Sequence, residues 1–161
     1  MKYAITAIAA AAALVTATVS SLAHEYTLGD LVIVHPVARA TPPGAPVSGG
    51  YMTIQNKGTE ADRLIGGAAD FAGKVEIHEM AMQGDVMKMR QLEDGLEIPA
   101  GGEVTLKPGG YHVMFMMMKQ PLEAGTKQKV KLIFQKAGEI DVDFNVVTPD
   151  KLQMDKKMKM N

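Results

Sequence analysis

Residues 74–92 read KVEIHEMAMQGDVMKMRQL, and they place a glycine-containing turn signal between two alternating runs. Apolar and polar residues alternate over Lys74–Met80 and again over Val86–Leu92, on either side of Gln83-Gly84-Asp85. A period of two residues is typical of a β-strand with one buried face, and a short turn between two such runs predicts a β-hairpin. This hairpin is the starting point for both the fold and the candidate site.

The register of the hairpin depends on which two residues form its turn. With Gln83-Gly84 as the turn, His78 faces Met89, whereas with Gly84-Asp85 as the turn Met80 faces Met89. The two registers differ by two residues in the pairing sum, so every side chain keeps its face of the hairpin. In both registers one face carries a histidine and three methionines: His78, Met80, Met87 and Met89.

A second run with the same character follows the turn Pro108-Gly109-Gly110. Its even-numbered positions share one face and carry His112, Met114 and Met116. Because the turn comes directly before it, His112 is expected at the start of its strand, near the rim of the fold. The opposite faces of the two runs are expected to supply core residues, namely Val75, Ile77, Tyr111, Val113, Phe115 and Met117.

Short alternating runs continue along the chain between turn signals, and no segment has a long, capped helical period. Many short strands at this spacing predict an all-β fold, either an antiparallel sandwich or a Greek-key barrel. The further strands expected are Leu31–Val34, Tyr51–Gln55, Val104–Lys107, Tyr111–Met117, Lys129–Phe134 and Ile140–Val146.

The composition is ordinary except for its sulfur-containing residues. The 161 residues are 47% hydrophobic and 22% charged, with a net charge of −1 that gives no indication of a nucleic-acid partner. Cysteine is absent, which excludes disulfides, thiolate metal sites and cysteine nucleophiles. Methionine occurs 13 times, and eight of these residues lie between positions 80 and 118. Packing explains any single methionine, but it does not explain their clustering with two histidines.

Imidazole and thioether groups on neighbouring strands indicate copper, and Cu(I) in particular. Soft thioethers select Cu(I), whereas Zn(II) sites use thiolate, imidazole or carboxylate ligands. An electron-transfer blue-copper site is excluded because it requires a cysteine thiolate.

The spacing of these residues resembles the H(M)-X10-M-X21/22-H-X-M signature of the periplasmic copper chaperones called PCu(A)C. Ten residues separate His78 from Met89, and twenty-two separate Met89 from His112-Val113-Met114. The surroundings, including Leu96–Gly102 and Leu106–His112, are similar to that family as well. The resemblance implies a cupredoxin-like β-barrel that holds one Cu(I) near its rim. By the same resemblance the ligands are His78, Met89, His112 and Met114, with Met80 as the optional second methionine of the first motif. Met116, which shares a strand face with His112 and Met114, is a further auxiliary candidate.

The resemblance also implies a role and partners. Copper is expected to be delivered to the CuA centre of cytochrome c oxidase, alongside thioredoxin-like Sco proteins. A periplasmic copper buffer or resistance protein would use the same site, and a structural β-domain with methionines only for packing is the third hypothesis. We expect no enzyme, because no catalytic arrangement stands out and four protein ligands leave no open position on the metal.

The two ends of the chain differ from the expected β-domain, which spans residues 24–148. An uncharged, alanine-rich run over Ala4–Val19 and the small residues of Ser21-Leu22-Ala23 predict a cleaved signal peptide over 1–23, hence a periplasmic protein. Cleavage would leave His24 at the amino terminus, where its amine and imidazole form a candidate Cu(II) chelate. Residues 149–161 are expected to form a flexible tail whose methionines are candidate weak ligands: Met154, Met158 and Met160.

Overall fold

A computed structural model describes residues 25–158 of the chain. The predicted signal peptide, His24 and Met160 therefore lie outside the described residues. The elements in chain order are β1 (Glu25–Leu28), β2 (Leu31–Arg39), β3 (Val47–Asn56), β4 (Asp62–Ala68), β5 (Ala72–Gln83), β6 (Val86–Gln91), β7 (Leu96–Ile98), β8 (Glu103–Leu106), β9 (Tyr111–Met118), β10 (Lys127–Phe134), β11 (Gly138–Val147) and α1 (Pro149–Met158).

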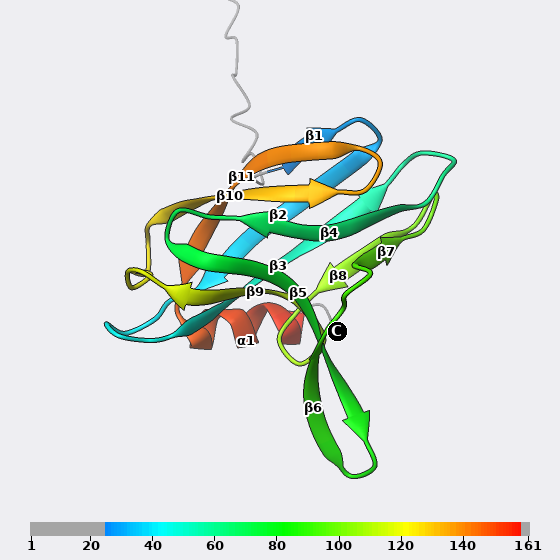
Figure 1. Cartoon of the computed structure of the whole chain (residues 1–161). Helices are drawn as coiled ribbons and strands as arrows, with labels where there is room; N and C mark the ends of the chain where they lie inside the picture. The colour runs from blue at the N-terminus through cyan, green and yellow to red at the C-terminus, as the bar shows by residue number, and fades with distance from the viewer. Residues whose placement is uncertain (1–24, 159–161) are drawn as a thin grey trace, which may run out of the picture.

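The strands form one sheet that closes on itself as a barrel (Figure 1). The closed ring runs through β2, β11, β10, β4, β5, β9 and β3, and β3 pairs back with β2. Strands β1, β8, β7 and β6 attach to the ring at β2, β3, β4 and β5 respectively. The β2–β11 pairing is parallel and the other pairings are antiparallel, so the predicted all-β barrel is confirmed.

Aromatic rings fill the centre of the barrel. The ring of Phe115 packs edge-on against Phe71 and Phe144, with centroids 5.0 Å and 5.9 Å away. A Cβ atom at Gly50 would lie 2.9 Å from Phe144 and 3.0 Å from Phe115, so only glycine lets β3 approach these rings so closely. This core is built without any of the predicted copper ligands, because the buried apolar cluster contains neither His78, His112, Met89 nor Met114.

Each run that the sequence marks as a strand corresponds to a strand of the structure, although the predicted runs Val86–Leu92 and Val104–Lys107 each extend one residue beyond the observed strand; three further strands were not predicted. Strands β1 and β7 are only four and three residues long, too short to show alternation clearly. Strand β4 contains Gly66-Gly67, a dipeptide that is more typical of turns than of strands. Gly67 instead allows close strand packing, because a Cβ atom there would lie 2.5 Å from the carbonyl oxygen of Lys131.

The carboxyl-terminal segment differs from the predicted flexible tail, because Pro149–Met158 forms helix α1. The sequence Thr148-Pro149-Asp150 is a helix start signal, with proline pre-set for the first turn and an acidic residue beside the helix amino terminus. A hydrogen bond with Thr148 lowers the pKa of Asp150. Leu152 is only 6% exposed, which ties the start of the helix to the body of the protein.

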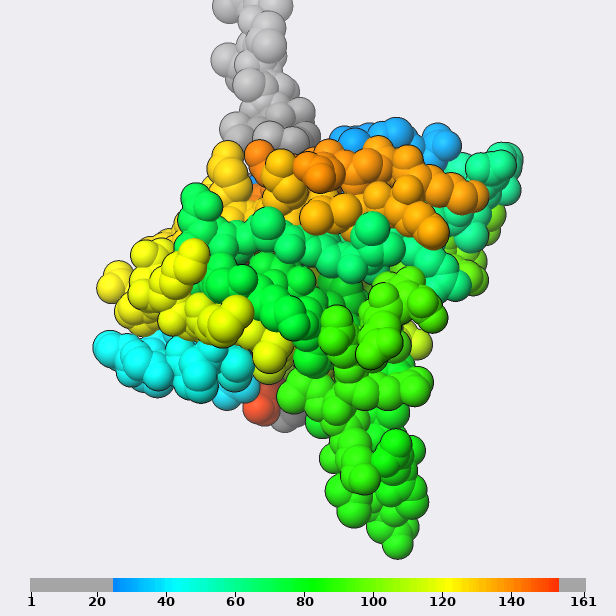
Figure 2. Space-filling model, viewed as in Figure 1, coloured from blue at the N-terminus to red at the C-terminus, as the bar shows by residue number. Residues whose placement is uncertain are grey.

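The β5–β6 hairpin extends beyond the barrel as a projecting arm (Figures 1 and 2). Its pairing follows the second of the two predicted registers, because Met80 faces Met89 and Gln83 faces Val86. Gly84 has a φ of 63°, which suits the first central position of a two-residue hairpin turn. Every residue of β6 is exposed. Among residues 25–158, no helix has both the length and the apolar composition that crossing a membrane requires.

Candidate metal centre

The candidate site lies where β5 runs between β9 and β6. His78 of β5 pairs with His112 of β9 on one side and with Gln91 of β6 on the other. One step along the same face, Glu76 pairs with Met114, and one step in the other direction Met80 pairs with Met89. His78 is therefore the centre of the cluster, with Met114 and Met89 as diagonal neighbours on opposite sides.

His112 and Met89 approach each other directly. The Nε2 atom of His112 lies 3.3 Å from the Sδ atom of Met89. The Nδ1 atom lies 3.0 Å from the carbonyl oxygen of Gly110, which can only accept, so Nδ1–H donates and Nε2 keeps its lone pair. Two metal-binding atoms from different strands thus point at the same space.

Burial keeps His112 in the form that a metal needs. Its side chain belongs to a residue only 7% exposed. Desolvation lowers the pKa of His112, the hydrogen bond to Gly110 raises it, and the nearby His78 lowers it further, with a net shift downward. The imidazole therefore stays neutral at a lower pH than an exposed histidine would.

His78 offers its other ring nitrogen. Its Nε2 atom lies 2.7 Å from Oε2 of Glu76, and because a carboxylate accepts, Nε2–H donates and Nδ1 holds the lone pair. That Nδ1 atom is buried and has no hydrogen-bond partner. A buried, unpartnered imidazole nitrogen is uncommon and unfavourable, and a bound metal ion would satisfy it. The rings of His78 and His112 are 5.8 Å apart between centroids and are tilted by 50°.

Glu76 is a functional candidate that the sequence analysis did not identify. Its carboxylate is buried and contacts both Lys74 and His78. Hydrogen bonds from Lys74 and then from His78 lower the pKa of Glu76, so it remains an anion that fixes the orientation of the His78 ring. The available signal was positional, because Lys74, Glu76 and His78 share one strand face at a spacing of two residues.

The remaining predicted residues differ in how close they come to this centre. Met114 is half-buried, and Met116 lies two positions further along β9, opposite Lys74. Met80 is half-buried at the outer side of the cluster. Met154 and Met158 lie in α1. His35, which is not among the predicted ligands, is exposed at an irregularity of β2 and has a φ of 51°.

Two expected core positions on β9 are wrong. Tyr111 is exposed, and Met117 is 60% exposed. Met117 has a φ of 52°, which interrupts the alternation so that the next residue, Met118, packs against the core instead. The sequence pattern did not reveal this irregularity because the six residues from Val113 to Met118 are all apolar.

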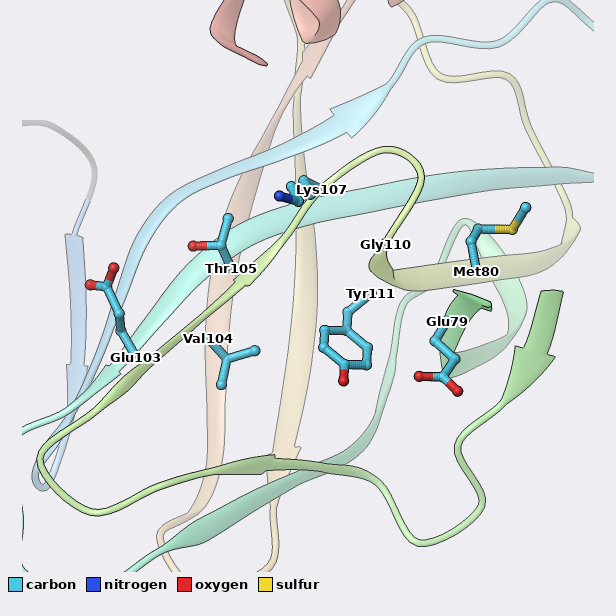
Figure 3. Close-up of a pocket in the computed structure, with 8 residues that line it drawn as sticks. All are labelled: Glu79, Met80, Glu103, Val104, Thr105, Lys107, Gly110 and Tyr111. Carbon is cyan, nitrogen blue, oxygen red and sulfur yellow. The ribbon is translucent and has the colours of Figure 1, made fainter. Parts of the chain in front are cut away.

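The rest of the described structure offers no stronger candidate for a metal site. Within residues 25–158, no three His, Asp or Glu side chains are grouped so that they could hold a metal ion. An open depression of about 540 Å³ lies beside β8, with Glu103 at one end and Glu79 and Met80 at the other (Figure 3). Of the residues that line this depression, only the auxiliary methionine Met80 is among the predicted copper-binding residues. The mixed histidine–methionine cluster remains the candidate metal centre.

Comparisons with known proteins match the chain to a family model and to relatives from two bacteria. Residues 31–146 match the family model described as "Putative lipoprotein LpqE-like". The chain is 33% identical over 91 residues to "Putative lipoprotein Lxx21020" of Leifsonia xyli subsp. xyli, and 29% identical over 84 residues to "Uncharacterized protein RP573" of Rickettsia prowazekii. These alignments cover 56% and 52% of this chain. The chain spans about half the length of each relative, 55% and 46% respectively.

The matches to solved structures cover more of this chain and more of the matched proteins than the alignments to these relatives do. The apo PCuAC domain from PmoF1 and the copper-bound PCuAC domain from PmoF2 are each 31% identical to the chain, with a TM-score of 0.67 and 78% of this chain covered. The matches cover 100% and 99% of those domains. The Cu(I)-bound solution structure of DR1885 from Deinococcus radiodurans is 27% identical, with a TM-score of 0.60, over 78% of this chain and 81% of that one. The barrel is therefore cupredoxin-like, as expected.

Proposed function

The chain belongs to the LpqE-like family and has the fold of PCuAC domains, and from this premise we propose that it is a copper chaperone. It holds one Cu(I) through His78, Met89, His112 and Met114. The observation that carries the proposal is the convergence of His112 Nε2 and Met89 Sδ, 3.3 Å apart, beside the unpartnered Nδ1 of His78. Copper-bound structures of similar domains support the choice of metal.

The donor chemistry suits an ion that is carried and then released. Two thioethers and two neutral imidazoles match the soft character of Cu(I). They bring no negative charge to the ion, so binding does not depend on ion-pair attraction and an acceptor with thiolate ligands can take the cargo. Because thioethers do not titrate, only His78 and His112 compete with protons for the metal. Met89 is 48% exposed and therefore gives a partner access to the metal.

The proposal also names the protein that receives the copper. The acceptor is the CuA centre of a cytochrome c oxidase subunit, with thioredoxin-like Sco proteins acting alongside. A periplasmic buffering or resistance role would use the same ligands. A deletion strain separates the two: a chaperone predicts loss of CuA-dependent oxidase activity that added copper restores, whereas a buffer predicts copper sensitivity with normal oxidase activity.

Export to the periplasm completes the proposal. The predicted signal peptide over residues 1–23 supports it, as do the lipoprotein descriptions of the family and of the Leifsonia relative. Cleavage after Ala23 would expose the His24 amine as a secondary Cu(II) site. Amino-terminal sequencing of the protein recovered from the periplasm tests both statements, since any other terminus removes the chelate.

Replacement of Met89 tests the metal site itself. The Met89→Leu variant keeps a side chain of similar volume at an exposed position, so its stability without metal should be unchanged. Its Cu(I) affinity, measured anaerobically against a competing chelator, should fall by at least the ~10–100-fold that follows loss of an outer-shell partner. Met117→Leu is a matched control, because Met117 is also exposed but lies at the far end of β9. Unchanged affinity in Met89→Leu would overturn the ligand assignment.

A further inference from the structure

The projecting hairpin carries more methionine than the candidate metal centre uses. Met82 and Met87 pair across the strands next to its tip, and they are 60% and 47% exposed. Met80 and Met89 form the next pair inward. We call these four residues the methionine face. It extends from the turn at Gly84-Asp85 to the pair His78–Gln91, along the arm that projects from the barrel (Figure 2).

Packing does not account for the methionine face. All six residues of β6 are exposed, and so is Met82 of β5, whereas Met80 is half-buried; burial in the barrel core therefore does not explain Met82, Met87 and Met89. The opposite face of the same hairpin is mixed and has no methionine: it carries an ion pair between Glu79 and Arg90, the pair Ala81–Lys88 and, next to the turn, the pair Gln83–Val86. On the methionine face, by contrast, both cross-strand pairs nearest the turn, Met82–Met87 and Met80–Met89, consist of methionine alone. A general apolar surface would not require one residue type at four positions.

The pairing brings the sulfur atoms within reach of a single ion. Residues directly opposite on antiparallel strands have Cβ atoms ~4.5–5.5 Å apart, and diagonal neighbours ~7–8 Å apart. Methionine has three rotatable side-chain bonds and a polarisable thioether, so three side chains at these separations can close around one soft cation. Thioether ligands without nitrogen or carboxylate partners select Cu(I) over the divalent metals.

We propose that Met82 and Met87, together with Met80, form a second Cu(I) site that receives the ion at the tip of the hairpin and hands it to the histidine–methionine centre through Met89. This inference rests on the proposed function, because it assumes a Cu(I) cargo. The transfer is a ligand exchange in which one neutral thioether replaces another on the same ion. Copper stays Cu(I), no electron moves, and a proton leaves only where an imidazole was protonated before it bound.

Silver(I) is a suitable probe because it shares the ligand preference of Cu(I) and does not change oxidation state. The full mature chain, labelled with 13C at the methionine methyl groups, is titrated with Ag(I) and followed by NMR. The first equivalent should shift the signals of Met89 and Met114, and the second should shift those of Met80, Met82 and Met87. Residue-resolved signals separate the hairpin from the methionines of the carboxyl-terminal segment.

The double variant Met82→Leu/Met87→Leu tests the site while preserving the apolar character of the tip. It should lose the second equivalent, retain the first with unchanged affinity, and load the first site from a Cu(I)–chelator complex more slowly than the wild type. Met117→Leu, which removes an equally exposed methionine outside the hairpin, should behave as the wild type.

Two results would overturn the inference. The first is a second equivalent that leaves the Met80, Met82 and Met87 signals unshifted. The second is a double variant that binds two equivalents and loads at the wild-type rate, which would make the methionine face an apolar docking surface. Failure of the proposed function is distinguishable from both, because it would appear as loss of the first equivalent from the wild-type protein.

Discussion

At the scale of single residues, the candidate centre depends on which nitrogen each histidine presents. Glu76 accepts the Nε2–H of His78, and the Gly110 carbonyl accepts the Nδ1–H of His112. The other nitrogen of His112 then faces Met89 Sδ, and the other nitrogen of His78 is left buried without a partner. The alternating sequence placed both histidines on the correct faces. It did not predict these tautomers, because they follow from hydrogen-bond partners that only the folded strands bring together.

Removal of the Glu76 carboxylate should weaken copper binding without removing a ligand. In Glu76→Ala the His78 ring loses its orienting acceptor, and we expect Cu(I) affinity to fall by the ~10–100-fold typical of a lost outer-shell partner. Glu76→Gln should recover part of the affinity, because its amide oxygen can still accept from Nε2–H. Anaerobic competition titration measures both. Glu97→Ala, which breaks the exposed ion pair with Arg63, is the control, and an equal loss there would show a general effect of charge.

The buried position of His112 predicts how the metal-free protein responds to acid. Burial lowers the pKa of His112 below its usual 6.5, so protons bind the unfolded chain more readily than the folded one. The stability due to neutral His112 is therefore complete above about pH 6.5 and is lost as the pH falls through the lower folded-state pKa. An NMR titration of the imidazole in the metal-free protein checks this. A midpoint at or above 6.5 would contradict the burial that the structure shows.

At the scale of secondary-structure elements, the register of the β5–β6 hairpin is what the sequence left open. Both registers satisfy the alternation, and Gly84, at a φ of 63°, selects the turn that pairs Met80 with Met89. Strand β4 and helix α1 were not predicted, for local reasons: β4 contains a glycine pair that is typical of turns, and α1 is a mostly polar, lysine-rich segment without a clear apolar stripe. The pairing of strands that are far apart in the sequence, such as β5 with β9, could not be predicted from local patterns, because it depends on how the whole barrel closes.

Asp62 joins β4 to the β10–β11 turn, and this connection should be sensitive to acid. Burial alone would raise the pKa of Asp62, but hydrogen bonds from the backbone N–H groups of Lys136, Arg63 and Ala137 together lower it below 3.8. The stabilisation is thus present above about pH 3.8 and is lost as the pH falls through the lower folded-state pKa.

Substitution of Asp62 measures the strength of this connection. Asp62→Ala leaves the part-buried N–H groups of Lys136 and Ala137 without their acceptor, and the free energy of unfolding at pH 7 should fall by about 2–3 kcal/mol. Asp62→Asn should show a smaller loss, because one amide oxygen still accepts. Denaturant unfolding at pH 7 and at pH 3 gives the comparison. An equal difference between wild type and Asp62→Ala at both pH values would show that the carboxylate charge contributes nothing.

At the scale of the whole molecule, the barrel core and the candidate metal centre are separate. The core is closed around Phe71, Phe115 and Phe144, whereas the candidate donors lie on the other face of β5 and β9 and on the β5–β6 hairpin. That hairpin projects from the barrel (Figure 1). The fold is therefore available before the metal binds, which suits a protein that alternates between loaded and empty states.

Removal of copper should leave the fold intact. The free energy of unfolding should fall only by the amount that copper binding contributes. At a free Cu(I) concentration of one hundred times Kd, binding adds ~2.7 kcal/mol to the free energy of unfolding. A Cu(I) chelator should lower the melting temperature accordingly while the far-UV circular dichroism at 25 °C stays unchanged. Loss of strand signal on chelation would show that the metal is structural rather than cargo.

The identity of the donors to Cu(I) is the central claim, and X-ray absorption of the mature protein loaded anaerobically with one equivalent tests it most directly. The arrangement of His78, His112, Met89 and Met114 predicts a first coordination shell with both nitrogen and sulfur scatterers, and loss of part of the sulfur contribution in Met89→Leu. A shell of nitrogen and oxygen alone, unchanged in Met89→Leu, would contradict the account.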